Sequence, residues 1–148
     1  MALKIGNKAP GFESINQKGD KVKLSDFIGK KVVLYFYPRD NTPGCTAQAC
    51  NLKDNYKTLQ KNGYTILGIS KDSPKSHQKF INKFDLPFDL IADEDQNVHI
   101  KYGTWIEKSM YGKNYMGTAR WTFLIDEKGN IENIIQKVKT KEHTSQIL

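Results

Sequence analysis

Two continuous apolar runs dominate the hydrophobic pattern of this chain. Residues 31–37 (Lys-Val-Val-Leu-Tyr-Phe-Tyr) and 64–70 (Tyr-Thr-Ile-Leu-Gly-Ile-Ser) are rich in β-branched and aromatic side chains, and polar residues do not alternate with them. Runs of this length and composition are typical of strands that are buried on both faces, as in a parallel sheet. The pattern therefore predicts two central strands.

A helical pattern follows each predicted strand. Apolar residues recur every two to four positions after Pro43 and predict an amphipathic helix that ends near Gly63. Ser73 and Pro74 supply a cap and a first helical residue for a second helix, which we expect to reach about Phe84. A strand–helix–strand order implies a right-handed crossover and parallel neighbouring strands.

Shorter elements complete the predicted order. We expect short strands at 12–15 and 21–24 joined as a hairpin, a helical turn at 25–27, a strand at 87–92, a helix carrying Val98 to Tyr102, a late hairpin of 121–126 and 131–138, and the start of a helix after Lys141. Residues 103–117 are rich in glycine and aromatic residues, and we expect them to form a loop. The elements predict an α/β fold with a mixed sheet flanked by helices, and we expect one domain over residues 1–148.

Composition narrows the classes of function. The net charge of +7 comes from basic residues that are scattered along 148 residues, with only two arginines, Arg39 and Arg120. No nucleic-acid-binding motif accompanies them, so we expect a solvated lysine surface and no nucleic-acid partner. No segment approaches the roughly 18 apolar residues that cross a membrane. We therefore expect a cytoplasmic protein without a membrane partner.

The first of the two cysteines follows a cluster of helix-start signals. Asp40, Asn41 and Thr42 can each cap a helix, and Pro43 suits a first helical position. This places Cys45 in the first turn, where free amide groups and the helix dipole stabilise an anion. Such surroundings lower the pKa of a thiol from about 8.5 to roughly 3.5–7.5. We predict an ionised, nucleophilic cysteine that oxidants can reach, with the Thr42 hydroxyl nearby.

The second cysteine, Cys50, lies five residues further along the same predicted helix. Five helical residues separate two Cα atoms by about 8.6 Å, whereas a disulfide requires about 7 Å or less. The two thiols therefore cannot bond unless the helix unwinds. Cys50 could instead be an ordinary buried cysteine. A structural disulfide is less favoured because of this geometry and because we expect a cytoplasmic protein. A metal site is less favoured because two cysteines without a nearby histidine make a poor set of ligands, so we expect no metal.

These residues resemble a known family. Pro38, Thr42 and Cys45 match the Pro-x-x-x-Thr-x-x-Cys motif of peroxiredoxins, and Cys50 matches the resolving-cysteine position of the bacterioferritin-comigratory-protein or peroxiredoxin Q subfamily. Further similar segments are residues 4–12, 67–70, 107–113, Arg120 and 122–126. The resemblance covers essentially the whole chain and implies a thioredoxin-like fold with an N-terminal β-hairpin extension.

The resemblance also implies a function. Cys45 would be the peroxidatic nucleophile that reduces hydrogen peroxide or an organic hydroperoxide, and Cys50 would resolve its sulfenic acid as an intramolecular disulfide. Thioredoxin or a similar dithiol would reduce that disulfide, without a cofactor, in an enzyme that is often a monomer. The site would also contain Thr42, Arg120 and Pro38, and a substrate pocket formed by Tyr37, Pro43 and Gly44.

The sequence departs from the family pattern at two positions, and two other functions are possible alternatives. Trp121 stands where relatives often have a smaller residue, and Gln48 stands where many carry glutamate, which puts a proton-handling role there in doubt. A thioredoxin-like disulfide reductase would require Cys-x-x-Cys, whereas the spacing here is Cys-x-x-x-x-Cys. A non-catalytic binding module of the same fold is the other alternative.

Overall fold

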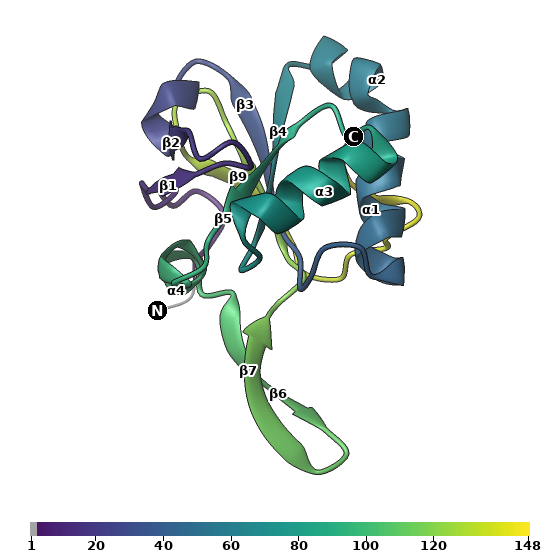
Figure 1. The fold of residues 1–148 in the computed structure, drawn as a ribbon. Coiled ribbons are helices and arrows are strands. Elements are labelled where there is room, and N and C mark those ends of the chain that lie inside the picture. Colours follow the sequence, from purple (N-terminus) through teal and green to yellow (C-terminus); the bar gives the residue numbers. More distant parts are fainter. Residues whose placement is uncertain (1–2) are drawn as a thin grey trace.

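A five-stranded mixed sheet forms the centre of the computed structural model, which describes residues 3–148 (Figure 1). Its strand order is β5-β4-β3-β8-β9. The strands β3 (Lys31–Phe36), β4 (Tyr64–Ser70) and β5 (Asp89–Ala92) are parallel, and β8 (Thr122–Ile125) and β9 (Ile131–Ile135) are antiparallel to their neighbours. The predicted mixed sheet with parallel central strands is confirmed.

The central strand β3 divides the core into two layers. Its side chains alternate between the faces of the sheet and are buried on both, because Val33 and Tyr35 belong to one apolar cluster while Val32, Leu34 and Phe36 belong to the other. This burial on both faces explains why the strand reads as a continuous apolar run.

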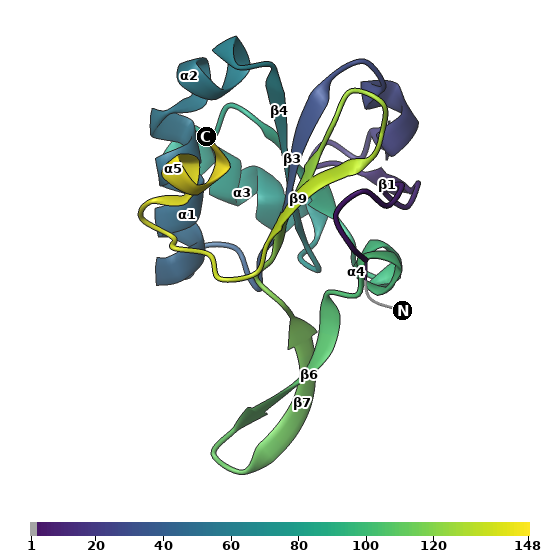
Figure 2. The ribbon, with the colours of Figure 1, turned by 180° about the vertical axis from the view of Figure 1, so that it is seen from behind.

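Helices and a small hairpin cover the two faces. On one side lie α1 (Pro43–Asp54), α2 (Tyr56–Lys61), α3 (Pro74–Phe84) and α5 (His143–Ile147) (Figures 1 and 2). On the other side lie the N-terminal hairpin of β1 (Glu13–Ile15) and β2 (Lys21–Lys23), the 3-10 turn η1 (Leu24–Phe27) and α4 (Asn97–Tyr102). Every helix within residues 3–148 is too short or too polar to cross a lipid bilayer.

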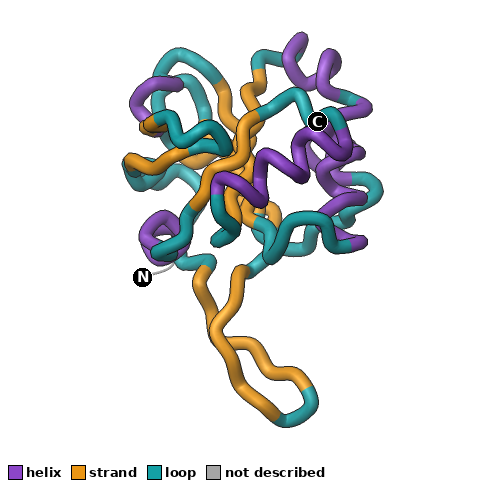
Figure 3. Tube along the Cα trace, in the orientation of Figure 1, coloured by secondary structure: helices purple, strands orange, loops and turns teal. Residues whose placement is uncertain are grey.

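The expectation of a loop at 103–117 is wrong. This segment forms a hairpin of β6 (Trp105–Met110) and β7 (Lys113–Thr118), which projects from the body of the molecule (Figures 1 and 3). Its turn consists of Tyr111 and Gly112, both with positive φ (52° and 77°). Positive φ at both central residues is the requirement of a tight type I′ hairpin turn. A tyrosine at the first of these positions is unusual, so the sequence signal is weak.

The long helix predicted after Pro43 is divided in two. Asn55 (φ −110°, ψ 16°) interrupts it between α1 and α2, and its side chain donates a hydrogen bond to the Asn51 carbonyl over 2.8 Å. An asparagine side chain that satisfies a nearby carbonyl competes with the helical backbone. The interruption lies beyond Cys50, so both cysteines remain in one continuous helix.

Candidate active site

The loop between β3 and α1 carries Cys45 to the start of a helix. Thr42 is the N-cap residue with extended backbone (φ −95°, ψ 156°), and Pro43 occupies the first helical position. The amide of Thr46 donates to the Thr42 carbonyl over 2.8 Å and closes the first turn. Cys45 therefore lies within this turn, where unpaired amides and the helix dipole favour negative charge.

The Cys45 thiol is almost completely enclosed. Only 1% of the residue's surface is exposed, and it belongs to the apolar cluster that contains Tyr35, Ala49 and Leu52. An oxidant must touch the sulfur atom in order to react with it. In contrast to the expectation of a reachable thiol, this conformation shields Cys45, so an oxidant can touch the sulfur only if the residues around it move.

Arg120 brings a permanent positive charge to this sulfur. Its Nη2 donates to Cys45 Sγ over 3.3 Å, although the two residues are 75 positions apart in the chain. Gly44 leaves room for the guanidinium, because a Cβ at this position would lie 3.2 Å from Nη2. Hydrogen bonds from a charged donor are stronger than neutral ones and favour an ionised acceptor. Together with the helix start, Arg120 can therefore stabilise a thiolate.

Gln48 is hydrogen-bonded to the other terminal nitrogen of the Arg120 guanidinium. Its Oε1 accepts a hydrogen bond from Arg120 Nη1 over 2.9 Å, and the side chain is fully buried. An amide has no proton that it readily gives up, so the geometry assigns Gln48 to orienting Arg120. Its Nε2 atom has no hydrogen-bond partner among the described residues. The spacing of three residues from Cys45 on one helix face is the signal that could have indicated this role.

Thr42 and Pro38 flank the helix start in different ways. The Thr42 hydroxyl donates to the Arg39 carbonyl over 2.9 Å and therefore fixes the loop. Pro38 is half-buried directly after the central strand, while Pro43 is exposed at the first turn. A role of Pro38 and Pro43 in shaping the surroundings of the thiol remains a prediction.

Tyr37, which we expected beside a substrate pocket, is directed into the core. The residue is 1% exposed, its ring stacks on Tyr35 with centroids 5.4 Å apart, and its hydroxyl donates to Asp40 Oδ1 over 2.6 Å. Burial and the nearby Asp40 carboxylate raise the pKa of Tyr37 well above its usual value, so the phenol keeps its proton. A contact between this ring and a substrate remains a prediction.

Cys50 lies in the intact part of α1. Both cysteines are free thiols, and Cys50 is half-buried, whereas Cys45 is buried. The helix runs without a break from Pro43 to Asp54. The Cα separation of about 8.6 Å expected for five helical residues therefore applies, and it exceeds the distance that a disulfide spans.

The projecting hairpin contributes a second cation near the site. Lys108 on β6 is half-buried, and a Cβ at Gly117 on β7 would lie 3.2 Å from its Cδ. Burial lowers the pKa of Lys108, the Arg120 guanidinium lowers it further, and negative charge at Cys45 acts in the opposite direction. The expectation of a loop at 103–117 assigned no role to this lysine, although the segment 107–113 resembles the family.

One group of side chains has the composition of a cation site. The ligand atoms of Asp40, Asp72 and His77 lie within 4.8 Å of one another. Asp40 is hydrogen-bonded to His77 through its carboxylate and to Asp72 through its backbone amide. These bonds are internal to the protein, and a structural role accounts for the grouping.

The chain is similar in sequence to a known family of proteins. Residues 5–134 match the AhpC/TSA family. Peroxiredoxin Bcp of Escherichia coli K12 is 47% identical over 146 residues, which cover 99% of this chain and 94% of the relative. Peroxiredoxin Bcp of Bacillus subtilis is 43% identical over 148 residues, which cover 100% of this chain and 94% of the relative.

Solved structures show the same fold. Peroxiredoxin Q of Xanthomonas campestris superimposes with a TM-score of 0.87 at 34% identity, over 92% of this chain and 86% of that one. A mutant of PrxQ from Xylella fastidiosa gives a TM-score of 0.92 at 30% identity, over 99% and 94% of the two chains. The fold is therefore that of the thioredoxin-like peroxiredoxins, and the chain belongs to the AhpC/TSA family, within its Bcp or peroxiredoxin Q group.

Proposed function

We propose that Cys45 is the residue through which this peroxiredoxin, a thiol-dependent peroxidase, reduces hydroperoxides. The observation that carries the proposal is the 3.3 Å contact between Arg120 Nη2 and Cys45 Sγ at the start of α1. A structural cysteine has no need of a permanent cation and a helix N-terminus, whereas a nucleophilic thiolate is stabilised by both.

In the first step, the Cys45 thiolate attacks the terminal oxygen of the hydroperoxide. The S–O bond forms as the O–O bond breaks, and the departing alkoxide or hydroxide takes up a proton to give alcohol or water. The sulfur is oxidised to sulfenic acid, and the peroxide is reduced. Arg120 and the helix-start amides can offset the negative charge that moves from sulfur to oxygen. Alkyl peroxide reduction is described for the related X. campestris protein, and we extend it to this chain.

The entrance to the sulfur would be formed by the residues around the first turn. Thr42, Pro43 and Gly44 form the start of the helix, and the Tyr37 hydroxyl donates to Asp40 in the preceding loop. We expect Pro38, earlier in the same loop, to line the entrance with them. Because Cys45 is 1% exposed, a small shift of this loop would admit the peroxide. We expect a narrow opening to exclude bulk water and to shield the thiolate.

In the second step, the Cys50 thiol displaces water from the Cys45 sulfenic acid and forms a disulfide. Cys50 is the only other thiol in the sequence. Since the two residues are held apart in α1, the first turns of the helix must unwind for the bond to form. The peroxidase cycle would then alternate between a helical reduced state and a locally unfolded oxidised state.

A dithiol protein such as thioredoxin would complete the cycle by reducing the disulfide. Such reductants maintain thiols in the cytoplasm, which is the location that we propose. The chemistry uses two thiols and needs no bound cofactor. We propose that residues 1–148 act as one domain and as a monomer. Size-exclusion chromatography with light scattering would test the last point.

A stoichiometric thiol titration tests the proposed function. One equivalent of hydrogen peroxide should remove both free thiols of the reduced protein within seconds, and Cys45→Ser should abolish the reaction. Cys50→Ser should still consume one equivalent but should not turn over with thioredoxin. Rapid reduction of insulin with slow loss of thiols to peroxide would instead indicate a disulfide reductase, and inertness in both assays would indicate a binding role.

A further inference from the structure

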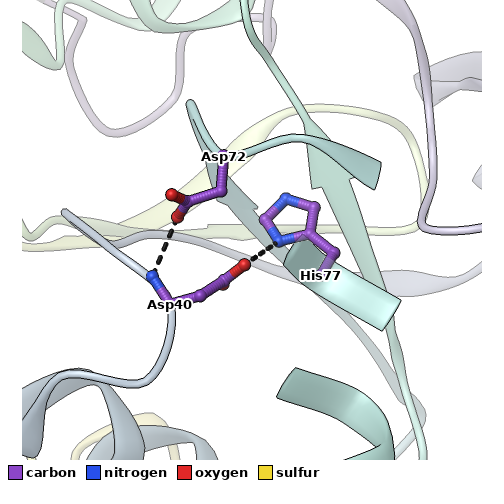
Figure 4. A group of neighbouring side chains, drawn as sticks. All are labelled: Asp40, Asp72 and His77. Atoms are coloured by element: carbon purple, nitrogen blue, oxygen red, sulfur yellow. Dashed lines mark hydrogen bonds and ion pairs between the residues drawn. The ribbon is translucent and has the colours of Figure 1, made fainter. Parts of the chain in front are cut away.

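A buried carboxylate fixes the loop in front of the active-site helix. Asp40 precedes Cys45 by five residues and is 9% exposed. Its Oδ1 accepts from the Tyr37 hydroxyl over 2.6 Å, and its Oδ2 accepts from the Ser76 hydroxyl over 2.8 Å. Oδ2 also lies 2.7 Å from His77 Nδ1 (Figure 4). Ser76 and His77 belong to α3, so this carboxylate joins the loop to a different helix.

The hydrogen-bond partners of His77 require a proton between the two residues. The ring is fully buried, and its Nε2 lies 2.9 Å from the Ile91 carbonyl, which can only accept, so Nε2 carries a hydrogen. If Nδ1 and the Asp40 carboxylate were both unprotonated, two acceptors would face each other at 2.7 Å. The pair therefore shares a proton, and this charge-assisted bond is of the strong type.

A second bond holds the backbone at the same point. The Asp40 amide donates to Asp72 Oδ2 over 2.8 Å (Figure 4). Asp72 is itself fixed by the Ser70 hydroxyl, which donates to Oδ2 over 2.6 Å. The next residue, Asn41, has a positive φ of 59°, so the chain turns sharply between this attachment and the Thr42 cap. The start of α1 is thus attached to α3 and to the end of β4 immediately before its first turn.

We propose that Asp40 and His77 are positioning residues that hold the first turn of α1 in its helical form around Cys45, and so set how readily it unwinds for disulfide formation. The inference rests on the proposed function, because it concerns the step between sulfenic acid and disulfide. Loosening the attachment should favour unwinding. It should also weaken the placement of Cys45 against Arg120.

The sulfenic acid has two fates that depend differently on unwinding. If the helix unwinds, the Cys50 thiol displaces water from the Cys45 sulfenic acid and the disulfide forms. If the helix stays wound, a second peroxide molecule oxidises the sulfenic acid to sulfinic acid and is itself reduced to alcohol or water. The peroxide concentration at which half of Cys45 becomes sulfinic acid therefore measures the balance between the wound and unwound states.

The experiment compares wild type with His77→Gln in single-turnover reactions. Reduced protein is mixed with graded hydrogen peroxide, and disulfide and sulfinic acid are quantified by mass spectrometry. We expect the half-oxidation concentration to rise about threefold to tenfold. This is less than the full value of a charge-assisted bond, because the bonds of Asp40 to Tyr37, Ser76 and Asp72 remain. The single variant Asp40→Asn, with His77 intact, should largely keep wild-type behaviour, because the amide can donate to His77 Nδ1 while its oxygen still accepts from Tyr37.

The matched control uses the second buried histidine–aspartate pair of the molecule. His99 is fully buried and bonds to Asp93 through Nδ1 and to Thr118 through Nε2, without touching the loop before α1. His99→Gln should lower thermal stability but leave the ratio of disulfide to sulfinic acid unchanged. If His77→Gln does not fold, Ser76→Ala removes one hydroxyl bond to Asp40 and should raise the half-oxidation concentration by about twofold.

Two results would overturn the inference. One is a wild-type ratio in folded His77→Gln, or in Ser76→Ala where that variant takes its place. The other is an equal change in His99→Gln, which would show that general stability sets the ratio. Absence of any disulfide in the wild-type protein would instead refute the proposed role of Cys50, so the two failures are distinguishable.

Discussion

Removal of the Arg120 side chain is the sharpest test of the proposed site. Arg120→Ala eliminates the donor to Cys45 Sγ and the donor to Gln48 Oε1. It leaves the sulfur at the helix start, where the backbone amides and the dipole still act. The substitution therefore separates the contribution of the guanidinium from that of the helix.

The size of the effect follows from the kind of bond that is lost. A hydrogen bond to a charged group contributes about 1.5–3 kcal/mol, and about 1.36 kcal/mol corresponds to a factor of ten in rate. Loss of the contact to sulfur should therefore slow the reaction with peroxide by about 10- to 150-fold. Arg120→Lys keeps the charge but not the planar guanidinium that reaches both Cys45 and Gln48. We therefore expect its rate of reaction with peroxide to decrease by an amount near the lower end of this range.

Quenched-flow mass spectrometry would measure the second-order rate constant for the oxidation of Cys45 by hydrogen peroxide. Arg39→Ala is the matched control, because the other arginine of the chain is exposed and its side chain has no hydrogen bond among the described residues. The control should react within twofold of wild type. A rate constant for folded Arg120→Ala that is also within twofold of wild type would refute the assignment of this arginine to the site.

Three further predictions concern other parts of the molecule. Gly44→Ala would place a Cβ 3.2 Å from Arg120 Nη2 and displace the guanidinium. The reaction with peroxide should slow by about threefold to tenfold in the same assay, which is less than the roughly 10²-fold that a 1 Å misplacement can cause. Leu34→Ala removes a fully buried side chain from β3 and should lower the free energy of unfolding in urea by about 2–5 kcal/mol; a loss below about 1 kcal/mol would contradict the packing described. Burial lowers the pKa of His143 in the folded protein. As the pH falls, this histidine therefore takes up a proton in the unfolded chain before it does so in the folded one. The free energy of unfolding should keep the full contribution of neutral His143 above about pH 6.5 and decrease as the pH drops below that value. Urea unfolding at several pH values should show a smaller fall for His143→Gln, and an equal fall would argue against this residue.

The buried parts of the fold were the most predictable from sequence. The expected strand at 64–70 coincides with β4, and the expected helix from Pro74 to about Phe84 coincides with α3, because burial on both faces and a clear cap leave strong signals. The hairpin of β6 and β7 was missed. Its side chains are largely exposed, and its turn uses Tyr111 where a glycine or asparagine would have been recognised.

The candidate site was predictable from sequence only where its geometry depends on neighbouring residues. Local spacing placed Cys45 and its cap at the start of a helix, because capping depends only on neighbouring residues. The contact of Arg120 with the sulfur could be expected only from the family resemblance, since 75 residues separate the two. The bond between Asp40 and His77 left no signal in the sequence, because the fold alone brings a loop and a distant helix together.

The C-terminal helix α5 packs against α1 and holds its C-terminal half in place (Figure 2). Asn51, the residue after Cys50, accepts from the Thr144 amide over 2.8 Å and donates to the Lys141 carbonyl over 2.8 Å. In the proposed unwinding, fraying that begins at Pro43 would stop at this attachment once it has passed Cys50. The ring of the proposed disulfide contains the six residues from Cys45 to Cys50, and the last turn of α1 would serve as a template on which the helix rewinds after reduction.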